Sequence, residues 1–333
     1  MMYLKDRRRD ALLLAGAVAL IAWGAAGLYQ NARCGFSGGL YTPDYTVPGV
    51  FPGSAAAKAG FVPGDRVISV EGIPVEKLGM ESRWPRALLP RVGESHRFLV
   101  ERTGGQVLIN MVYEAPSRRV LNRRLAVAFI GFSFLTLGLW AFLTVRTHHA
   151  LALAQIGLAA GAGASLGLGP NLGSWNGVQG HVSTASTVLM CILLLRFFVM
   201  FPKAKPVSRS RLAMWVVYGA WGCFLVFLVL ELLVHPALYY EAGTVAYPLM
   251  LAYGALTLAA IAHTVVRNPR AEVLQSGMVL ILAGLLAAIA ALAAAMRILI
   301  LPGWTYALLI TAIPLTMALA VRKNARLTGP GAN

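Results

Sequence analysis

The stretch VFPGSAAAKAG at residues 50–60, followed by PGDRVISVEG at residues 63–72, decides the fold of the first part of this chain. Its proline and glycine pairs turn the backbone, and Ser54 has the hydroxyl side chain favoured at a helix N-cap. A short helix is predicted over residues 55–59, and Gly60 is placed to end it in the left-handed conformation. The order of strand, turn, short helix, turn and strand predicts a small α+β domain.

Four segments around this stretch have the composition of β-strands: residues 45–51, 66–71, 96–101 and 107–113. The last two flank residues 103–106, TGGQ, which predicts a hairpin. Strict alternation within residues 66–71 predicts that Val70 lies on the face opposite Val67. A longer helix is predicted within residues 82–91.

Outside this domain the chain is far more apolar. Of its 333 residues 58% are hydrophobic and only 13% are charged, whereas soluble domains carry about a quarter charged residues. The formal net charge is +16. Between Arg33 and Ser117, however, nine basic residues face eight acidic ones, so the excess positive charge lies elsewhere. A nucleic-acid partner is therefore not expected, and membrane flanks are the better interpretation.

Eight apolar runs are long enough to span a bilayer: residues 11–28, 125–145, 150–169, 183–201, 212–234, 245–266, 274–295 and 303–321. The short loops at 170–182 and 235–244 contain no Lys or Arg, whereas the alternate loops do. The positive-inside rule then places both termini in the cytoplasm of a bacterial cell and the residues between the first two spans outside its inner membrane.

The predicted fold class is thus an all-α polytopic membrane bundle of eight transmembrane helices with an extracytoplasmic α+β domain between helices 1 and 2. We divide the chain into a cytoplasmic N-terminus with the first helix (1–32), a periplasmic domain (33–117), a seven-helix membrane domain (118–322) and a short cytoplasmic tail (323–333). Gly157, Gly161, Gly163 and Gly167 predict close packing of neighbouring helices.

Residues 50–60 and 63–72, together with Pro74-Val75, resemble the core of a bacterial PDZ domain. The resemblance implies that an extended peptide adds a strand to the domain and that a glycine-containing loop holds the peptide C-terminus. In this chain that loop would be Gly38-Gly39-Leu40-Tyr41. Pro43 and Pro48 remove backbone donors that such a strand would need, so a structural PDZ-like module without a ligand stays open as an alternative.

The membrane part, with LRFFVMFPKAKP at residues 195–206, resembles the sensor half of PDZ-containing bacterial receptor histidine kinases. Only residues 322–333 follow the last span, so we expect no kinase in this chain. Intramembrane metalloproteases also carry PDZ domains, but they need the H-E-x-x-H motif, in which two His bind zinc and the Glu acts as base. No His here precedes a Glu, which led us to predict that the protein is not an enzyme.

Charged residues next to or within the spans are the remaining candidate site residues, because each is costly in a membrane. Four arginines before the second span break the positive-inside rule and are expected to contact anionic lipid or pair with acids of the domain: Arg118, Arg119, Arg123 and Arg124. Arg196 is expected to reach the interface from its span. Glu231 is expected to pair with His235 or Arg297.

The resulting hypothesis is a non-enzymatic receptor-like or partner-docking membrane protein, with a structural subunit of a larger complex as the alternative. The expected partner is another membrane or periplasmic protein or a peptide C-terminus. A minor alternative is a b-haem protein whose ligands would come from His148, His149 and His263 at one level and His181 and His235 at the other. No cofactor or metal is otherwise expected, because Cys34, Cys191 and Cys223 lack metal-ligand spacing.

Overall fold

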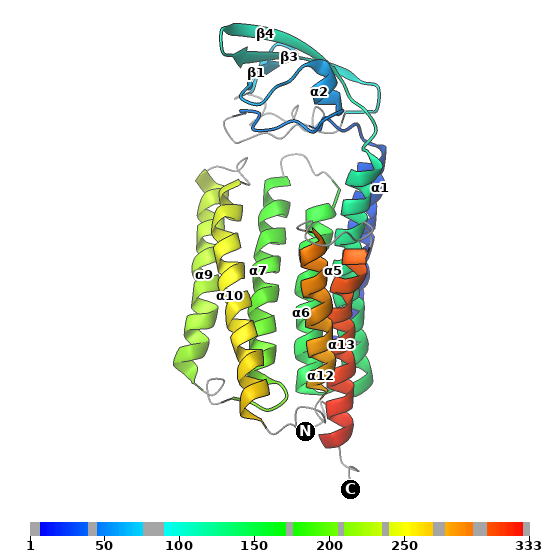
Figure 1. Cartoon of the computed structure of the whole chain (residues 1–333), viewed down its shortest axis with the longest axis vertical. Coiled ribbons are helices and arrows are strands. Elements are labelled where there is room, and N and C mark those ends of the chain that lie inside the picture. Colours follow the sequence, from blue (N-terminus) through cyan, green and yellow to red (C-terminus); the bar gives the residue numbers. More distant parts are fainter. Residues whose placement is uncertain are drawn as a thin grey trace.

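The computed structural model describes residues 7–38, 45–75, 90–170, 176–205, 210–234, 240–268, 277–295 and 305–328. A small β-sheet domain stands on one end of a bundle of long helices (Figure 1). The chain enters this domain from helix α1 (Arg7–Arg33) and leaves it into helix α5 (Arg118–Val145). The domain is therefore an insert between the first two long helices, as the composition change predicts.

The described part of the bundle continues with α6 (His148–Leu168), α7 (Asn176–Met200), α9 (Arg211–Val234), α10 (Tyr240–Arg267), α12 (Met278–Ala295) and α13 (Thr305–Thr328). Within the described residues, seven helices are long and apolar enough to cross a membrane, namely all of these long helices except α12. A membrane protein with several spanning helices is thus supported, and the exact count of eight spans stays a prediction. The start of α1 and the end of α13 lie together, away from the sheet domain (Figure 1).

Small residues bring the helices of the bundle close together. A Cβ added to Gly138 of α5 would lie 2.6 Å from the Leu153 carbonyl oxygen of α6, and one on Gly157 of α6 would lie 2.4 Å from the Phe134 oxygen of α5. The helices therefore touch backbone to backbone on both sides of their contact. One apolar core lies around α5 and α6, and a second lies between α7, α9 and α10.

The sheet domain contains strands β1 (Arg66–Val70), β2 (Ile73–Pro74), β3 (Ser95–Arg102) and β4 (Gly105–Val112), which are antiparallel in the order β2-β1-β3-β4. The predicted hairpin is the β3–β4 pair. The short helix α2 (Ala55–Ala59) has the bounds expected from the sequence. Beneath it the Phe61 and Phe98 rings meet edge to face at 5.4 Å, within a core that includes Val47, Val100 and Met111.

Two strand predictions need correction. Residues 45–51 form no strand but isolated bridges, one of them between Thr46 and Arg66, because Tyr45 has a positive φ of 63° and Pro48 has no N–H to continue a ladder. In β1 a bulge between Val67 and Ser69 breaks the alternation, so that Val70 is buried like Val67. The helix predicted within residues 82–91 lies almost entirely outside the described residues.

Candidate functional site

Helix α2 is fixed at both ends by the residues that the sequence singles out. The Ser54 hydroxyl accepts a hydrogen bond from the Ala57 N–H at 3.3 Å, and Gly60 ends the helix with φ of 94°. Both conformations are those of a capped helix. Ala55 and Ala56 face the core, so this short helix is a rigid support for the segment that packs against it.

The segment that leads to the predicted carboxylate-binding loop crosses α2 and is anchored to it by backbone hydrogen bonds. The Ala56 N–H donates to the Ser37 oxygen at 2.8 Å, and the Phe51 N–H donates to the Gly38 oxygen at 2.9 Å. Gly38 has φ of +72°, and a Cβ there would lie 2.2 Å from the Ser54 Cβ. Glycine is therefore required at this position by both conformation and space.

Of the predicted loop, only Gly38 is placed, since Gly39, Leu40 and Tyr41 lie outside the described residues. The structure thus places the entry to the loop, and a peptide-binding groove stays a prediction. The strands opposite this entry are held by polar contacts that the sequence analysis did not single out.

Asp65, the acid of the PGD turn, is fully buried and forms the central polar contact of the domain. Its carboxylate accepts hydrogen bonds from Arg102 at 2.7 and 2.8 Å and from the Val62 N–H at 2.9 Å. Arg102 also donates to the Gly60 oxygen at 2.8 Å. Burial alone would raise the pKa of Asp65, but these donors outweigh it and hold the pKa below its ordinary value. The pair fastens the 60–65 turn to β3.

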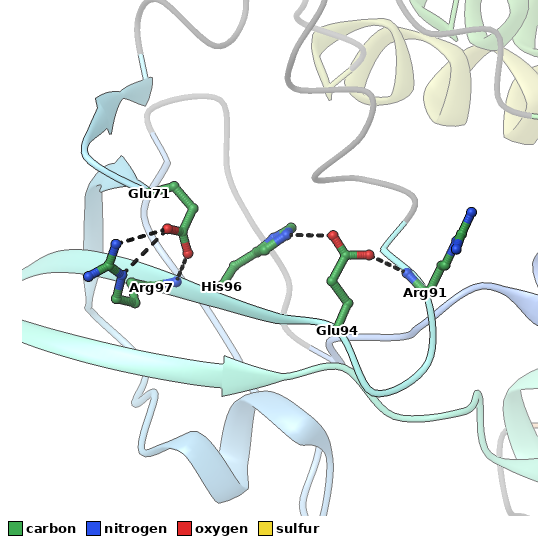
Figure 2. Close-up of polar contacts among 5 residues, drawn as sticks. All are labelled: Glu71, Arg91, Glu94, His96 and Arg97. Atoms are coloured by element: carbon green, nitrogen blue, oxygen red, sulfur yellow. Dashed lines mark hydrogen bonds and ion pairs between the residues drawn. The ribbon is translucent and has the colours of Figure 1, made fainter.

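Figure 2 shows a second set of polar contacts, at the start of β3. Glu71 accepts from the Arg97 N–H at 2.6 Å and pairs with its guanidinium at 3.3 Å. Glu94 accepts from the Arg91 N–H at 2.8 Å and lies 3.0 Å from His96 Nε2. Backbone donation from Arg97 and from Arg91 is the largest cause of the lowered pKa of Glu71 and of Glu94, respectively. As a carboxylate, Glu71 therefore positions the β3 backbone at Arg97, and Glu94 likewise holds the turn that precedes β3.

The four arginines before the second span lie in the first two turns of α5, next to the junction with the sheet domain. Arg118, Arg119 and Arg123 are exposed and Arg124 is half-buried beside Cys34. None of the described acids forms an ion pair with them. The alternative in which they pair with acids of the domain gains no support from this part of the chain.

The intramembrane polar residues meet in a way that the sequence did not predict. Glu231 of α9 is buried and lies 3.2 Å from His181 Nε2 of α7. Its predicted partners, His235 and Arg297, are outside the described residues. Arg196 is half-buried on α7. A spacing pattern could not have found the Glu231–His181 pair, because it depends on how two separate helices pack.

The histidines of the haem alternative have other neighbours. His149 Nε2 lies 3.2 Å from the Met200 carbonyl oxygen, and its ring meets Phe201 edge to face at 5.3 Å. His181 faces Glu231. The described residues contain no group of three His, Cys, Asp or Glu side chains that could hold a metal ion.

Comparison with known proteins agrees with the geometry of the sheet domain. Residues 46–102 match the PDZ domain family. The chain contains a PDZ domain. Over 94 residues it is 43% identical to proteins from Brucella suis and Brucella melitensis that are each named "Putative zinc metalloprotease", and 34% identical to a protein of the same name from Mesorhizobium japonicum. These matches cover 28% of this chain and 24–25% of the relatives.

These relatives correct the functional interpretation drawn from the sequence. Their names are those of proteases and not of histidine kinases, so the resemblance to a kinase sensor half is not upheld. The prediction of a non-enzymatic receptor or docking protein is contradicted by the same finding, and its subunit and haem alternatives are no better supported. The prediction set intramembrane metalloproteases aside because no His in the sequence precedes a Glu, whereas the relatives that match over 94 residues carry the protease name.

The name of the relatives implies zinc, and the donor groups of this chain can be tested against that metal. A catalytic zinc site takes three protein ligands, commonly two His and a carboxylate. The described residues offer two His–Glu pairs, His181–Glu231 and His96–Glu94, and no group of three potential ligands. The sequence also lacks any His followed by Glu. The described residues therefore do not fit a zinc site of this type.

Proposed function

We propose that this protein takes part in proteolysis at a membrane and that its PDZ domain selects the substrate by holding an extended peptide segment. The observation that carries the proposal is the 43% identity to two proteins named as metalloproteases over 94 residues, 28% of this chain. That share of the chain corresponds in size to the PDZ domain and its junctions. We therefore assign the function shared with those proteases to the PDZ domain.

Peptide capture by a PDZ domain depends on main-chain hydrogen bonds, which accept many sequences, and on side-chain pockets, which choose among them. The anchored entry at Gly38 supports this role. Its carbonyl is occupied by the Phe51 N–H, so the next residues begin from a fixed backbone position. A loop that starts from a rigid base loses less entropy when it closes on a carboxylate.

We also propose that the PDZ domain lies outside the cytoplasm of a bacterial inner membrane, with both chain ends in the cytoplasm. Arg146 ends α5, Arg211 begins α9 and Arg267 ends α10, and these helix ends lie away from the PDZ domain. Their charge favours the cytoplasmic side. In intact cells, with the three native cysteines replaced by Ser, a membrane-impermeant maleimide should label Arg66→Cys but not Arg326→Cys, and the reverse result would invert the orientation.

Peptide capture is tested by substitution at two glycines that share one backbone conformation. Gly38 and Gly53 have φ of +72° and +73°, but a Cβ on Gly53 meets nothing within 4 Å. Gly38→Ala should weaken binding of fluorescent C-terminal peptides to the full-length protein in nanodiscs, whereas Gly53→Ala bears only the conformational cost. Equal affinities for the two variants, or no saturable binding by the unaltered protein, would contradict peptide capture at this loop.

The link to proteolysis needs a separate measurement in cells. Quantitative proteomics of membranes with and without the protein should show a set of membrane proteins that accumulate uncleaved in its absence. Gly38→Ala should reproduce part of that accumulation, and Gly53→Ala should not. If the turnover of every membrane protein is unchanged when the chain is removed, the proposed function is wrong.

A further inference from the structure

Exposed arginines from two neighbouring helices gather where the PDZ domain joins the bundle. Arg33 is the last residue of α1, and Arg118, Arg119 and Arg123 lie in the first turns of α5. Figure 1 shows these two helix ends side by side. We call these four residues the arginine belt. All four side chains are exposed.

The described acids do not neutralise this belt. The structure describes the side chains of seven acidic residues, and each pairs with a different basic residue that lies outside the belt. At the other end of α5, in contrast, Arg146 forms two contacts of 2.6 and 2.7 Å with Asp10 of α1. The same two helices thus carry an arginine paired with an acid at one end and, at the end next to the PDZ domain, arginines that form an ion pair with none of the described acids.

The belt lies directly above surface that faces away from the bundle. Arg118, Asn122, Leu125 and Phe129 follow one another three or four residues apart and so share one face of α5. Leu125 and Phe129 remain 44% and 45% exposed, which is typical of side chains that contact lipid in a membrane-spanning helix. The guanidinium of Arg118 therefore stands at the end of a lipid-facing stripe.

On α1, an exposed tyrosine lies one helical turn before Arg33. Tyr29 is 60% exposed, and the Arg33 guanidinium lies 4.2 Å from the centre of its ring. Exposed tyrosines with a neighbouring cation are typical of the headgroup layer, where the ring meets acyl chains and the charge meets phosphate. Two helices thus place arginines at one depth, just outside an apolar surface.

From this geometry we propose that the arginine belt is a binding site for the phosphate groups of anionic lipids in the leaflet on the PDZ side. Guanidinium groups bind phosphate oxygens through paired N–H donors, and the site lies where α5 emerges from the PDZ domain. The Ser117 hydroxyl caps α5 there by accepting from the Val120 N–H at 3.4 Å. Bound lipid would hold this junction, and with it the PDZ domain, close to the membrane surface.

The test measures lipid binding to the full-length protein in phosphatidylcholine nanodiscs that contain increasing fractions of phosphatidylglycerol. Native mass spectrometry should find phosphatidylglycerol retained in preference to phosphatidylcholine. Arg118→Gln with Arg119→Gln should lower that preference roughly 10-fold to 30-fold, since each basic residue at an anionic surface contributes about threefold to fivefold. Raising the salt concentration should weaken it further.

The matched control is Arg66→Gln with Arg97→Gln, which removes the same charge from exposed positions on the PDZ sheet. This control should keep the lipid preference. An equal loss in both double variants would show a general charge effect and overturn the proposal. Competition by millimolar inorganic phosphate would point to a soluble phosphate site instead, and unchanged retention in Arg118→Gln/Arg119→Gln would exclude the belt.

Discussion

The described ion pairs of the PDZ domain are mostly exposed, whereas those of the helix bundle are mostly buried. Of the seven described ion pairs, five lie in the PDZ domain, and three of these leave both side chains at least 40% exposed. The two in the bundle, Arg146–Asp10 and His181–Glu231, are at most 17% exposed. Exposed pairs contribute little to stability, whereas a broken buried pair leaves a charge without a partner.

The contrast teaches where each region obtains its specificity. In the bundle, glycines such as Gly138 and Gly157 lack a side chain, so neighbouring helices pack closely and need few polar contacts. The PDZ domain is too small for a large apolar core, so its turns are fixed by Asp65 and by capped helix ends. Substitutions in the two regions should therefore have effects of different size and origin.

The largest effect is expected at Asp65, which among the described acids of the PDZ domain is the one buried like those of the bundle. Asp65→Ala leaves the Val62 N–H and part of Arg102 without an acceptor and should destabilise the domain by about 3 kcal/mol or more. Hydrogen exchange of β1 and β3 in the full-length protein should rise while that of α5 stays unchanged. Unaltered protection of both strands would contradict the central role of this pair.

The same pair predicts a pH dependence with a definite sign. The pKa of Asp65 lies below its ordinary value in the folded domain. Its contribution is therefore present above the unfolded pKa of about 3.9 and is lost as the pH falls through the folded value. Asp65→Asn should flatten the loss of PDZ protection between about pH 5 and pH 2. A variant that loses protection as steeply as the unaltered protein would assign the acid sensitivity to other carboxylates.

The next largest effect concerns close packing in the bundle. A Cβ on Gly27 of α1 would lie 2.0 Å from the Leu168 carbonyl oxygen of α6, so Gly27→Ala must push two backbones apart. We expect a destabilisation of about 2 kcal/mol by thermal unfolding in detergent. The control is Gly16→Ala in the same helix, where a Cβ meets nothing within 4 Å. Equal melting temperatures would show that α1 is not packed in this way.

Sequence patterns predicted the parts of the fold that depend on local chemistry. Ser54, Gly60 and the β3–β4 hairpin were found because caps and tight turns need particular residues at fixed spacings. The bulge in β1 was missed because it depends on the neighbouring strand, which a local pattern does not contain. The loss of the strand at 45–51 was missed because the positive φ of Tyr45 has no sequence signature.

The candidate site was less predictable for the same reason. Gly38 was identified from a family pattern, but its need to be glycine comes from Ser54, which lies 16 residues further along. The partner of Glu231 was assigned to nearby or similarly placed residues, whereas the structure supplies His181 from another helix. Contacts between distant segments are set by packing, and one sequence gives no direct measure of it.

A smaller effect is expected from the buried pair of the bundle, because polar contacts in membrane proteins are weaker than their burial suggests. In a double-mutant cycle of His181→Ala and Glu231→Ala, the coupling free energy should be about 1 kcal/mol. Thermal unfolding of the two single variants and the double variant measures it. A coupling near zero would show that the two side chains are neighbours without a stabilising interaction.

The smallest effect is expected at Glu71, whose pair with Arg97 leaves both side chains at least 40% exposed. Glu71→Gln removes the charge but keeps an oxygen that can accept from the Arg97 N–H, which lies 2.6 Å from Glu71 Oε1. The loss should therefore be about 0.5 kcal/mol and should shrink further in high salt. Hydrogen exchange of β3 in Glu71→Gln, compared with that in Asp65→Ala, measures this loss of stability. A loss as large as that of Asp65→Ala would mean that exposure does not determine how much an ion pair contributes to stability. The difference between the PDZ domain and the bundle would then have to rest on packing alone.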